Sequence, residues 1–419
     1  MEIFTYEKLG ETLYKDILPN GLTAYYLPKP SFHKTYGLFT TAFGSLDTEF
    51  GGLTYPEGIA HFLEHKLFEK EDGDVMDKFS ALGAYTNAFT SFNRTSYLFS
   101  ATENIEENVR LLLDFVQTGY FTDELIAKEQ GIITQEIQMY QDEPDWRLFA
   151  GLLASLYPDS PLAYDIAGTP ESISRISSDM LMANHTRFYQ PANLTLFVTG
   201  PFEVETMSEL VRQNQVGKNL PEAEPIERSD FQPSPAELST SIEMDIYQPK
   251  VALGLRGEEK IPLEKLASYR LAIQLFLNLN FGKTSQFYEV NYTSGLIDES
   301  FTYEIEFDSR FHCVIFSADA ENPAEVIKLL QERLKSYKIE SDWTKAHLEL
   351  IKRQLLGSFY RSLNSLEFIA NEFSSSLSET SNLFDFPEEL SLLTLEKIEK
   401  ISENFLSKAQ KSVFTILPK

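Results

Sequence analysis

A chain of 419 residues is too long for one ordinary hydrophobic core, so two domains of roughly 200 residues are expected. The excess of 63 acidic over 36 basic residues gives a formal charge of −27, which argues against nucleic acid and anionic membranes as partners. The single cysteine, Cys313, excludes an internal disulfide framework. The first residues lack the basic start and apolar run of a signal peptide, and no apolar stretch approaches the length of a membrane span. We therefore expect a cytoplasmic protein.

Hydrophobic periodicity predicts a mixture of strands and helices in the first half of the chain, residues 1–215. The expected strands lie at about 22–27, 36–43, 84–90, 95–100 and 194–198. The expected helices are one after Gly58, one at about 75–82 that stops at Gly83, one from near Glu103 past Leu113, and one from the N-cap Thr122 to about Tyr140.

Residues 216–240 are expected to form an interdomain linker, because prolines alternate with Glu, Asp and Ser there without an apolar period. The second half, residues 241–419, repeats much of the order of the first. Its expected strands lie at about 250–255, 300–306, 312–318 and 413–417, and its expected helices at about 266–278, 285–290 and 323–335.

This order of elements predicts an α+β fold with two similar halves. Each half is expected to hold a mainly antiparallel sheet with helices packed on one face, and the two halves are expected to face each other as a clamshell. The first half is expected to carry the chemistry, and the second half to be a degenerate repeat without a metal site.

The five residues His61-Phe62-Leu63-Glu64-His65 form the motif with the clearest chemistry. Residues four apart in a helix lie on one face, so His61 and His65 could bind a single ion, and Glu64 could reach a water on that ion. The order His-x-x-Glu-His is the inverzincin signature of zinc peptidases. The alternative is a polar helix face or a hydrogen-bonded core pair, since motif matches of this length also occur by chance.

A catalytic zinc site needs a third protein ligand, and the long helix after Thr122 offers Glu129 and Glu136. The two glutamates are seven residues apart and hence lie on one face. Exposed glutamates on a helix are usually only solvated. Glu136, however, is flanked by Ile132, Ile133 and Ile137, and a buried carboxylate needs a partner or a metal.

With these residues the chain resembles the pitrilysin/insulinase family of zinc metallopeptidases, the inverzincins, and in particular its small bacterial members. The family carries His-x-x-Glu-His and a glutamate some seventy to eighty residues further on; here Glu136 follows His65 by 71 residues. Further matches to the N-terminal half of family members are Asn87-Ala88-Phe89-Thr90, Leu156-Tyr157-Pro158, Gly168-Thr169 and Tyr189-Gln190-Pro191-Ala192-Asn193.

The resemblance implies a zinc endopeptidase that cleaves extended or unfolded peptides. His61, His65 and Glu136 would be the zinc ligands, and Glu64 the catalytic base that activates a zinc-bound water. Glu129 would join the catalytic set as the carboxylate that orients a ligand. The strand residues Asn87, Ala88, Phe89 and Thr90 would bind the peptide by β-augmentation, although the same strand could be an ordinary sheet edge.

The sequence departs from the family in its second half. Family members supply an Arg and a Tyr, spaced Arg-x6-Tyr beside a Gly-Leu pair, to polarise the substrate carbonyl. If Gly295-Leu296 is that pair, the two positions hold Asn291 and Asp298. A carboxylate is a poor stabiliser of an oxyanion, so we expect a paralogous partner subunit to supply the missing groups. A homodimer is the alternative, but two copies would still lack them.

The stretches 62–75 and 135–142 resemble most closely the Gram-positive YmfH-type group of this family. That resemblance implies a partner of the YmfF type and an association with elongation factor P modification. A second hypothesis is therefore a non-catalytic assembly or binding subunit, as some family relatives are. The intact ligand set favours the enzyme. The remaining histidines, which have no ligand-spaced neighbours, are expected to be structural or exposed: His33, His185, His312 and His347.

Overall fold

The computed structural model describes residues 1–218, 220–221, 223–228, 231–377 and 380–419. These residues form two compact units, and each unit takes one segment from the other half of the sequence. Unit 1 contains the described residues of 1–138, 165–229 and 363–375, and unit 2 contains those of 139–164, 230–362 and 376–419. Four residues of the expected linker, 219, 222, 229 and 230, lie outside the described residues; the others between 216 and 238 contain no helix or strand.

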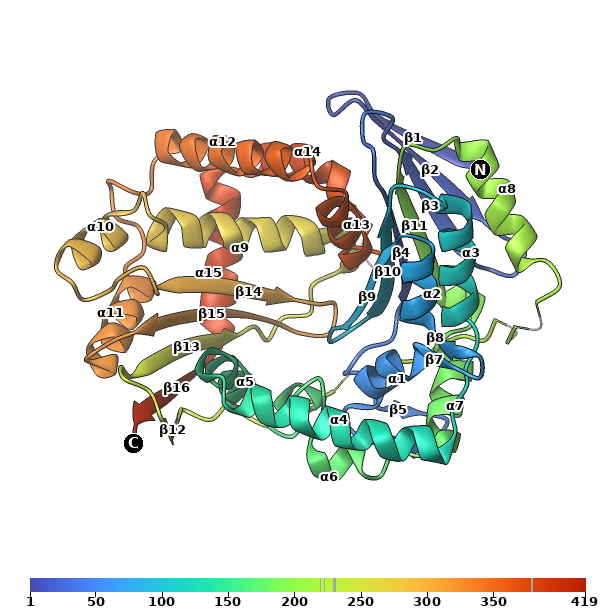
Figure 1. The fold of residues 1–419 in the computed structure, drawn as a ribbon. Helices are drawn as coiled ribbons and strands as arrows, with labels where there is room; N and C mark the ends of the chain where they lie inside the picture. Colours follow the sequence, from blue (N-terminus) through green and yellow to red (C-terminus); the bar gives the residue numbers. More distant parts are fainter. Residues whose placement is uncertain (219, 222, 229–230, 378–379) are drawn as a thin grey trace. The chain divides into compact units, whose positions relative to one another are not determined.

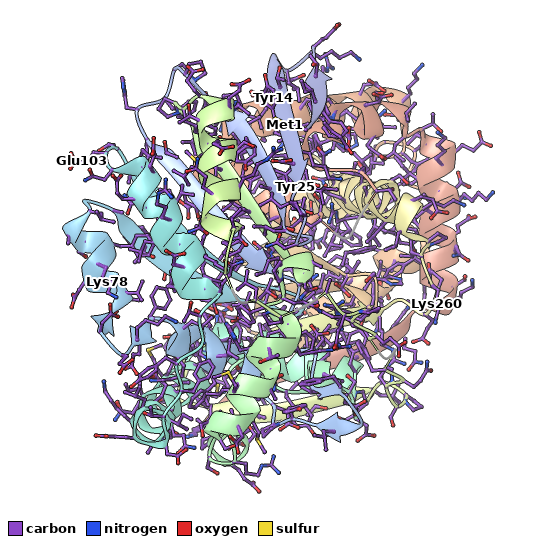
Figure 2. The ribbon with its side chains drawn as sticks, turned by 90° about the vertical axis from the view of Figure 1, so that its right-hand side faces the viewer. Met1, Tyr14, Tyr25, Lys78, Glu103 and Lys260 are labelled. Atoms are coloured by element: carbon purple, nitrogen blue, oxygen red, sulfur yellow. The ribbon has the colours of Figure 1, made fainter. Side chains whose placement is uncertain are left out.

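Unit 1 is built on a seven-stranded sheet (Figure 1). Its strands, from edge to edge, are β1 (Glu2–Tyr6), β2 (Glu11–Ile17), β3 (Thr23–Pro28), β11 (Leu194–Gly200), β4 (Thr35–Thr41), β10 (Thr95–Ala101) and β9 (Tyr85–Thr90). All neighbours are antiparallel except β3 and β11. Figure 2 labels Tyr14 on β2 and Tyr25 on β3. Strand β9 is an edge strand that pairs only with β10 among the described strands.

Most helices of unit 1 pack on one apolar core with this sheet. Two short hairpins, β5–β6 (Glu49–Phe50 and Leu53–Thr54) and β7–β8 (Glu69–Lys70 and Gly73–Asp74), complete that side. The helices are α1 (Ile59–Leu67), α2 (Val75–Ala81), α3 (Ile105–Val116), α4 (Asp123–Gln141, which belongs to unit 1 up to Gln138), α6 (Pro170–Ile173), α7 (Ser178–Phe188) and α8 (Val204–Gln215).

One further helix, not foreseen from the sequence, covers the opposite face of this sheet. Helix α13 (Leu366–Ser375) belongs to unit 1 and packs on β4 and β11. Leu196 and Val198 of β11 point into the main core, whereas the ring of Phe197 lies 4.8 Å from that of Phe373. The sequence predicts an apolar β11 but does not specify which distant segment covers its second face.

Unit 2 repeats this topology in a five-stranded sheet. Its order is β12 (Ser239–Met244), β16 (Gln410–Pro418), β13 (Lys250–Arg256), β15 (His312–Asp319) and β14 (Thr302–Phe307). The single parallel pair, β12–β16, corresponds to β3–β11 of unit 1. The helices of unit 2 are α5 (Pro144–Leu156), α9 (Leu266–Phe281), α10 (Gln286–Thr293), α11 (Pro323–Lys335), α12 (Lys345–Ser362), α14 (Phe386–Leu392) and α15 (Leu395–Lys408).

The α+β class with two similar halves is therefore confirmed, since five strands recur in the same order and with the same directions. Helix α5 packs on β13 and β16, the strands that correspond to those covered by α13 in unit 1. None of the helices in the described part of the chain combines the length and hydropathy that a membrane span requires.

Candidate metal centre

Helix α1 carries the His-x-x-Glu-His motif and is held by its apolar face. Phe62 and Leu63 are fully buried in the core of unit 1, and Ile59 and Leu67 extend the same stripe by one turn in each direction. The two histidines lie on the less buried side of the helix. Their rings are 4.5 Å apart, as expected for residues one turn apart.

The start of α1 is fixed by a close contact between two glycine turns. Gly58 has φ +89° and Gly168 has φ +77°, a region that L side chains rarely adopt. A Cβ on Gly58 would lie 2.4 Å from the carbonyl oxygen of Ala167, and one on Gly168 would lie 2.5 Å from that of Glu57. The Ser172 hydroxyl donates a 2.8 Å hydrogen bond to the same Glu57 carbonyl. Gly168-Thr169, which matches the family in sequence, therefore belongs to the turn that holds the start of the motif helix α1.

Helix α4 places both of its predicted glutamates against α1. Ile126, Ile133 and Ile137 bury one face of α4, and Glu129 on that face is only 5% exposed. Glu136 lies two turns further along and is partly exposed. The helix begins after Thr122, whose hydroxyl accepts a hydrogen bond from the Leu125 amide, as predicted for an N-cap.

The structure brings His61, His65 and Glu136 together. One ligand atom of each residue lies within 4.8 Å of the other two. The Glu136 carboxylate oxygens lie 3.8 Å from Nε2 of His61 and 3.6 Å from Nε2 of His65. Two donors bound to one tetrahedral zinc at about 2.1 Å are roughly 3.4 Å apart, so these separations suit a shared ion. No other such group of three occurs among the described residues.

Glu129 holds the far side of His65. Its Oε1 lies 3.0 Å from Nδ1 of His65, which leaves Nε2 of that ring facing Glu136. Its Oε2 lies 3.3 Å from Nζ of Lys66. A carboxylate on the outer nitrogen of a metal-binding histidine fixes the tautomer and the ring orientation. The orienting role expected for Glu129 stays a prediction, and these two contacts are what that role would require.

Glu64, the residue directly before His65 on α1, points to the same region. It is 7% exposed, and its Oε2 accepts a 2.5 Å hydrogen bond from the Thr90 hydroxyl at the end of β9. Thr90 is in turn 3.2 Å from the Thr95 hydroxyl, which donates to the Phe43 carbonyl. The sequence predicted Thr90 as a substrate-binding residue, but its contact with Glu64 was not foreseen.

Burial controls the electrostatics of these groups. It lowers the pKa of His61 to about 3, with the charge of His65 acting in the same direction, and it raises the pKa of Glu64 to about 7. Burial also raises the pKa of Glu136. For His65 burial opposes protonation, but the hydrogen bond to Glu129 and the neighbouring carboxylates outweigh it and raise the pKa.

The donor set fits a zinc ion. Two imidazoles and one carboxylate are a common ligand set of catalytic zinc. A histidine must be neutral to bind a metal, and the low pKa of His61 keeps its ring neutral. The other ring nitrogen of His61, the buried Nδ1, has no hydrogen-bond partner among the described residues.

The predicted peptide-binding residues lie on the edge strand β9. Because side chains alternate along a strand, Thr90 and Ala88 face α1, and Phe89 and Asn87 face the other side. Asn87 and Tyr85 line a cavity of about 430 Å³ on that second side. As expected for a sheet edge, one side of β9 has no neighbouring strand among those described.

The residues at the positions of the family Arg and Tyr serve local structure. Asn291 is buried in α10 and donates a 2.7 Å hydrogen bond to the Phe287 carbonyl. Asp298 accepts hydrogen bonds from the amide and hydroxyl of Ser300 in a turn. Both lie in unit 2.

The sequence interpretation overlooked Lys66. Its side chain is fully buried, and it follows the apolar residues Phe62 and Leu63 at helical spacing. A lysine on the apolar stripe of a predicted helix is the signal that could have identified it.

Comparison with known families assigns the class of protein. Residues 53–170 match the family description "Insulinase (Peptidase family M16)", and residues 175–355 match "Peptidase M16 inactive domain". A zinc protease of Bacillus subtilis strain 168, named YmfH, is 41% identical over 423 aligned residues, which cover 99% of this chain and 98% of the relative. The chain belongs to peptidase family M16.

Solved structures agree with this assignment. An M16-like peptidase from Alicyclobacillus acidocaldarius matches with a TM-score of 0.92 and 31% identity, covering 98% of this chain and 99% of that one. A protease from Helicobacter pylori matches with a TM-score of 0.81 and 19% identity, covering 97% and 99%. The second likeness supports the fold alone.

Proposed function

We propose that the chain is a zinc-dependent endopeptidase that hydrolyses extended or unfolded peptides. The observation that carries the proposal is the meeting of His61, His65 and Glu136 beside a buried Glu64. The names of the relatives support zinc as the metal. The cytoplasmic location expected from the sequence is part of the same proposal.

The three ligand side chains would hold the ion. When bound, zinc acidifies a coordinated water and polarises a carbonyl. Glu64 accepts a proton from the attacking water and later delivers it to the leaving amine. Burial favours this role, because a pKa raised to about 7 lets Glu64 both take and release a proton near neutral pH. Thr90 holds the carboxylate in place, and Glu129 holds the ring of His65.

The substrate would bind along β9. An extended peptide can add to the open side of an edge strand through main-chain hydrogen bonds, which do not depend on its sequence. Thr90 ends this strand at the Glu64 carboxylate, so a peptide bound along β9 would reach the proposed catalytic base.

We further propose that full activity needs a paralogous partner subunit. Asn291 and Asp298 are occupied with local hydrogen bonds and offer no cation or phenol to a substrate carbonyl. Losing one oxyanion-stabilising donor costs about a hundred- to a thousand-fold in rate. A YmfF-type protein that keeps Arg and Tyr would be a suitable partner, and a homodimer is the less suitable one.

A second candidate is a non-catalytic assembly or binding subunit, associated with elongation factor P modification. The match of residues 175–355 to an M16 inactive domain favours it, together with the absence of the Arg–Tyr pair. The complete ligand set of unit 1 favours the enzyme.

Zinc content and peptide cleavage test the two candidates. We expect one zinc per chain after purification without chelators, slow cleavage of an unfolded peptide by the chain alone, and a rate increase of about a hundred-fold or more with the partner. Glu64→Gln should keep the zinc and lose the cleavage. Absence of stoichiometric zinc would overturn the enzyme, and full activity of the isolated chain would overturn the need for a partner.

A further inference from the structure

Lys66 is the most buried charged side chain next to the candidate metal centre. It is 0% exposed and follows directly after His65 on α1. Removing a cation from water is unfavourable unless opposite charges compensate it, so its partners should be close. Its Nζ contacts two carboxylates, Oε2 of Glu69 and, at 3.3 Å, Oε2 of Glu129.

Glu129 therefore binds two successive residues of α1. One of its oxygens lies 3.0 Å from Nδ1 of His65, and the other lies 3.3 Å from Nζ of Lys66. With both oxygens engaged, the carboxylate cannot rotate about its terminal bond without losing a partner. The orientation of the His65 ring then depends on Lys66, although Lys66 lies on the opposite side of Glu129.

The charges along this chain of contacts alternate from the core to solvent. Buried Glu129 meets buried Lys66, Lys66 meets the partly exposed Glu69, and the other oxygen of Glu69 lies 3.4 Å from the exposed Lys128. Without Lys66, Glu129 and Glu69 would be two neighbouring carboxylates with no buried cation between them. Glu129 would then lose the contact of its Oε2, and its carboxylate could rotate away from Nδ1 of His65.

We propose that Lys66 is a positioning residue of the zinc centre. It holds the Glu129 carboxylate in the orientation in which His65 presents Nε2 to the metal. This inference rests on the proposed function only in that the metal is zinc, and it concerns metal affinity rather than peptide cleavage.

The closing experiment measures zinc affinity by competition with a chromogenic chelator, on the full chain. We expect Lys66→Met to weaken zinc binding by about 10- to 100-fold, the usual effect of losing an outer partner of a metal ligand. Glu129→Gln should have a similar effect, and the double variant should be little worse than either single variant, because both changes break the same contact. Lys66→Arg, which keeps the charge, should restore part of the affinity.

Lys352→Met is the matched control. Lys352 is also a buried lysine, but it lies in unit 2 and donates to the Leu393 carbonyl. This variant should lower the thermal stability and leave the zinc affinity unchanged. Thermal unfolding of each variant verifies that it is folded. If Lys66→Met does not fold, the zinc affinities of Glu129→Gln and Lys66→Arg provide the test.

The outcomes separate the two proposals. A zinc affinity within two-fold of wild type for Lys66→Met, or additive losses in the double variant, would overturn the role of Lys66. Zinc binding by wild type without any peptide cleavage, even with the partner added, would overturn the proposed enzyme and still measure the role of Lys66. A wild-type chain that binds no zinc would overturn both.

Discussion

The hydroxyl of Thr90 donates a 2.5 Å hydrogen bond to Oε2 of Glu64. This contact joins the end of the edge strand β9 to the motif helix α1 within unit 1. The strand that would bind the peptide therefore also positions the residue that would move the proton. A displacement of β9 by a bound peptide would therefore be expected to change catalysis as well as binding.

Replacing Thr90 by valine should lower peptide hydrolysis without loss of zinc. Valine keeps the shape but removes the donor, and a hydrogen bond to a charged group contributes about 1.5–3 kcal/mol. We expect kcat to fall by roughly ten- to a hundred-fold, measured by steady-state cleavage of a fluorogenic unfolded peptide in the presence of the partner.

Thr86→Val is the control for this change. Thr86 lies on the same face of β9, and its hydroxyl donates to the Leu98 carbonyl instead of to Glu64. It should retain kcat within about two-fold. Equal losses in the two variants would mean that the strand, rather than the contact with Glu64, matters.

Gly168→Ala should destabilise unit 1 and misplace the motif helix. A Cβ at Gly168 would lie 2.5 Å from the Glu57 carbonyl oxygen, and the φ of +77° disfavours alanine independently. We expect a loss of about 2–4 kcal/mol in the free energy of unfolding, measured by urea denaturation.

Gly131→Ala is the opposite case on α4, between the two glutamates. A Cβ on Gly131 would have no atom of the described residues within 4 Å outside its own helix backbone and chain neighbours, and the residue is in mid-helix. Alanine should stabilise the protein there by about 0.5–1 kcal/mol. If Gly168→Ala left the free energy of unfolding unchanged, the contact between Gly58 and Gly168 would not be what fixes the start of α1.

Local patterns predicted most of the site but not its supports. The spacing of His61 and His65 follows from helix geometry, Glu136 is assigned as the third ligand through the family resemblance, and the structure brings all three side chains together. The sequence did not predict several elements of the first half, among them β1, β2, α5 and α7. Helices α5 and α13 each join the unit formed mainly by the other half of the sequence, and such long-range exchange leaves no trace in local periodicity. The role of Thr90 depends on the three-dimensional distance to Glu64, which the sequence alone does not give.

Removing zinc should lower the stability of the folded chain. A metal that binds the native state stabilises it by mass action, by about 4 kcal/mol at a thousand-fold excess over Kd. We expect a chelator such as EDTA to lower the Tm by several degrees, measured by differential scanning fluorimetry of the zinc-loaded protein.

His61→Ala should abolish this chelator effect, because it removes one of the three donors. His33→Ala is the control, since His33 is exposed and lies outside the candidate metal centre. An identical Tm of wild type with and without EDTA would contradict a bound structural or catalytic metal.

Glu306 of β14 should make the stability of the protein fall as the pH rises. Burial, with a smaller effect of the Glu304 charge, raises the pKa of Glu306 from 4.5 to about 7 in the folded chain. Between these two values the folded state keeps a proton that the unfolded state has released, so the free energy of unfolding decreases with pH and stays lower above about 7.

Glu306→Gln cannot ionise and should therefore be more stable than wild type by about 1–2 kcal/mol at pH 8, with partial solvent screening allowed for, and nearly equal to it at about pH 4.5. Urea denaturation at the two pH values measures the difference, and Glu299→Gln, at an exposed glutamate of the same unit, is the matched control. A gain of the same size at both pH values would mean that packing, not ionisation of Glu306, is responsible.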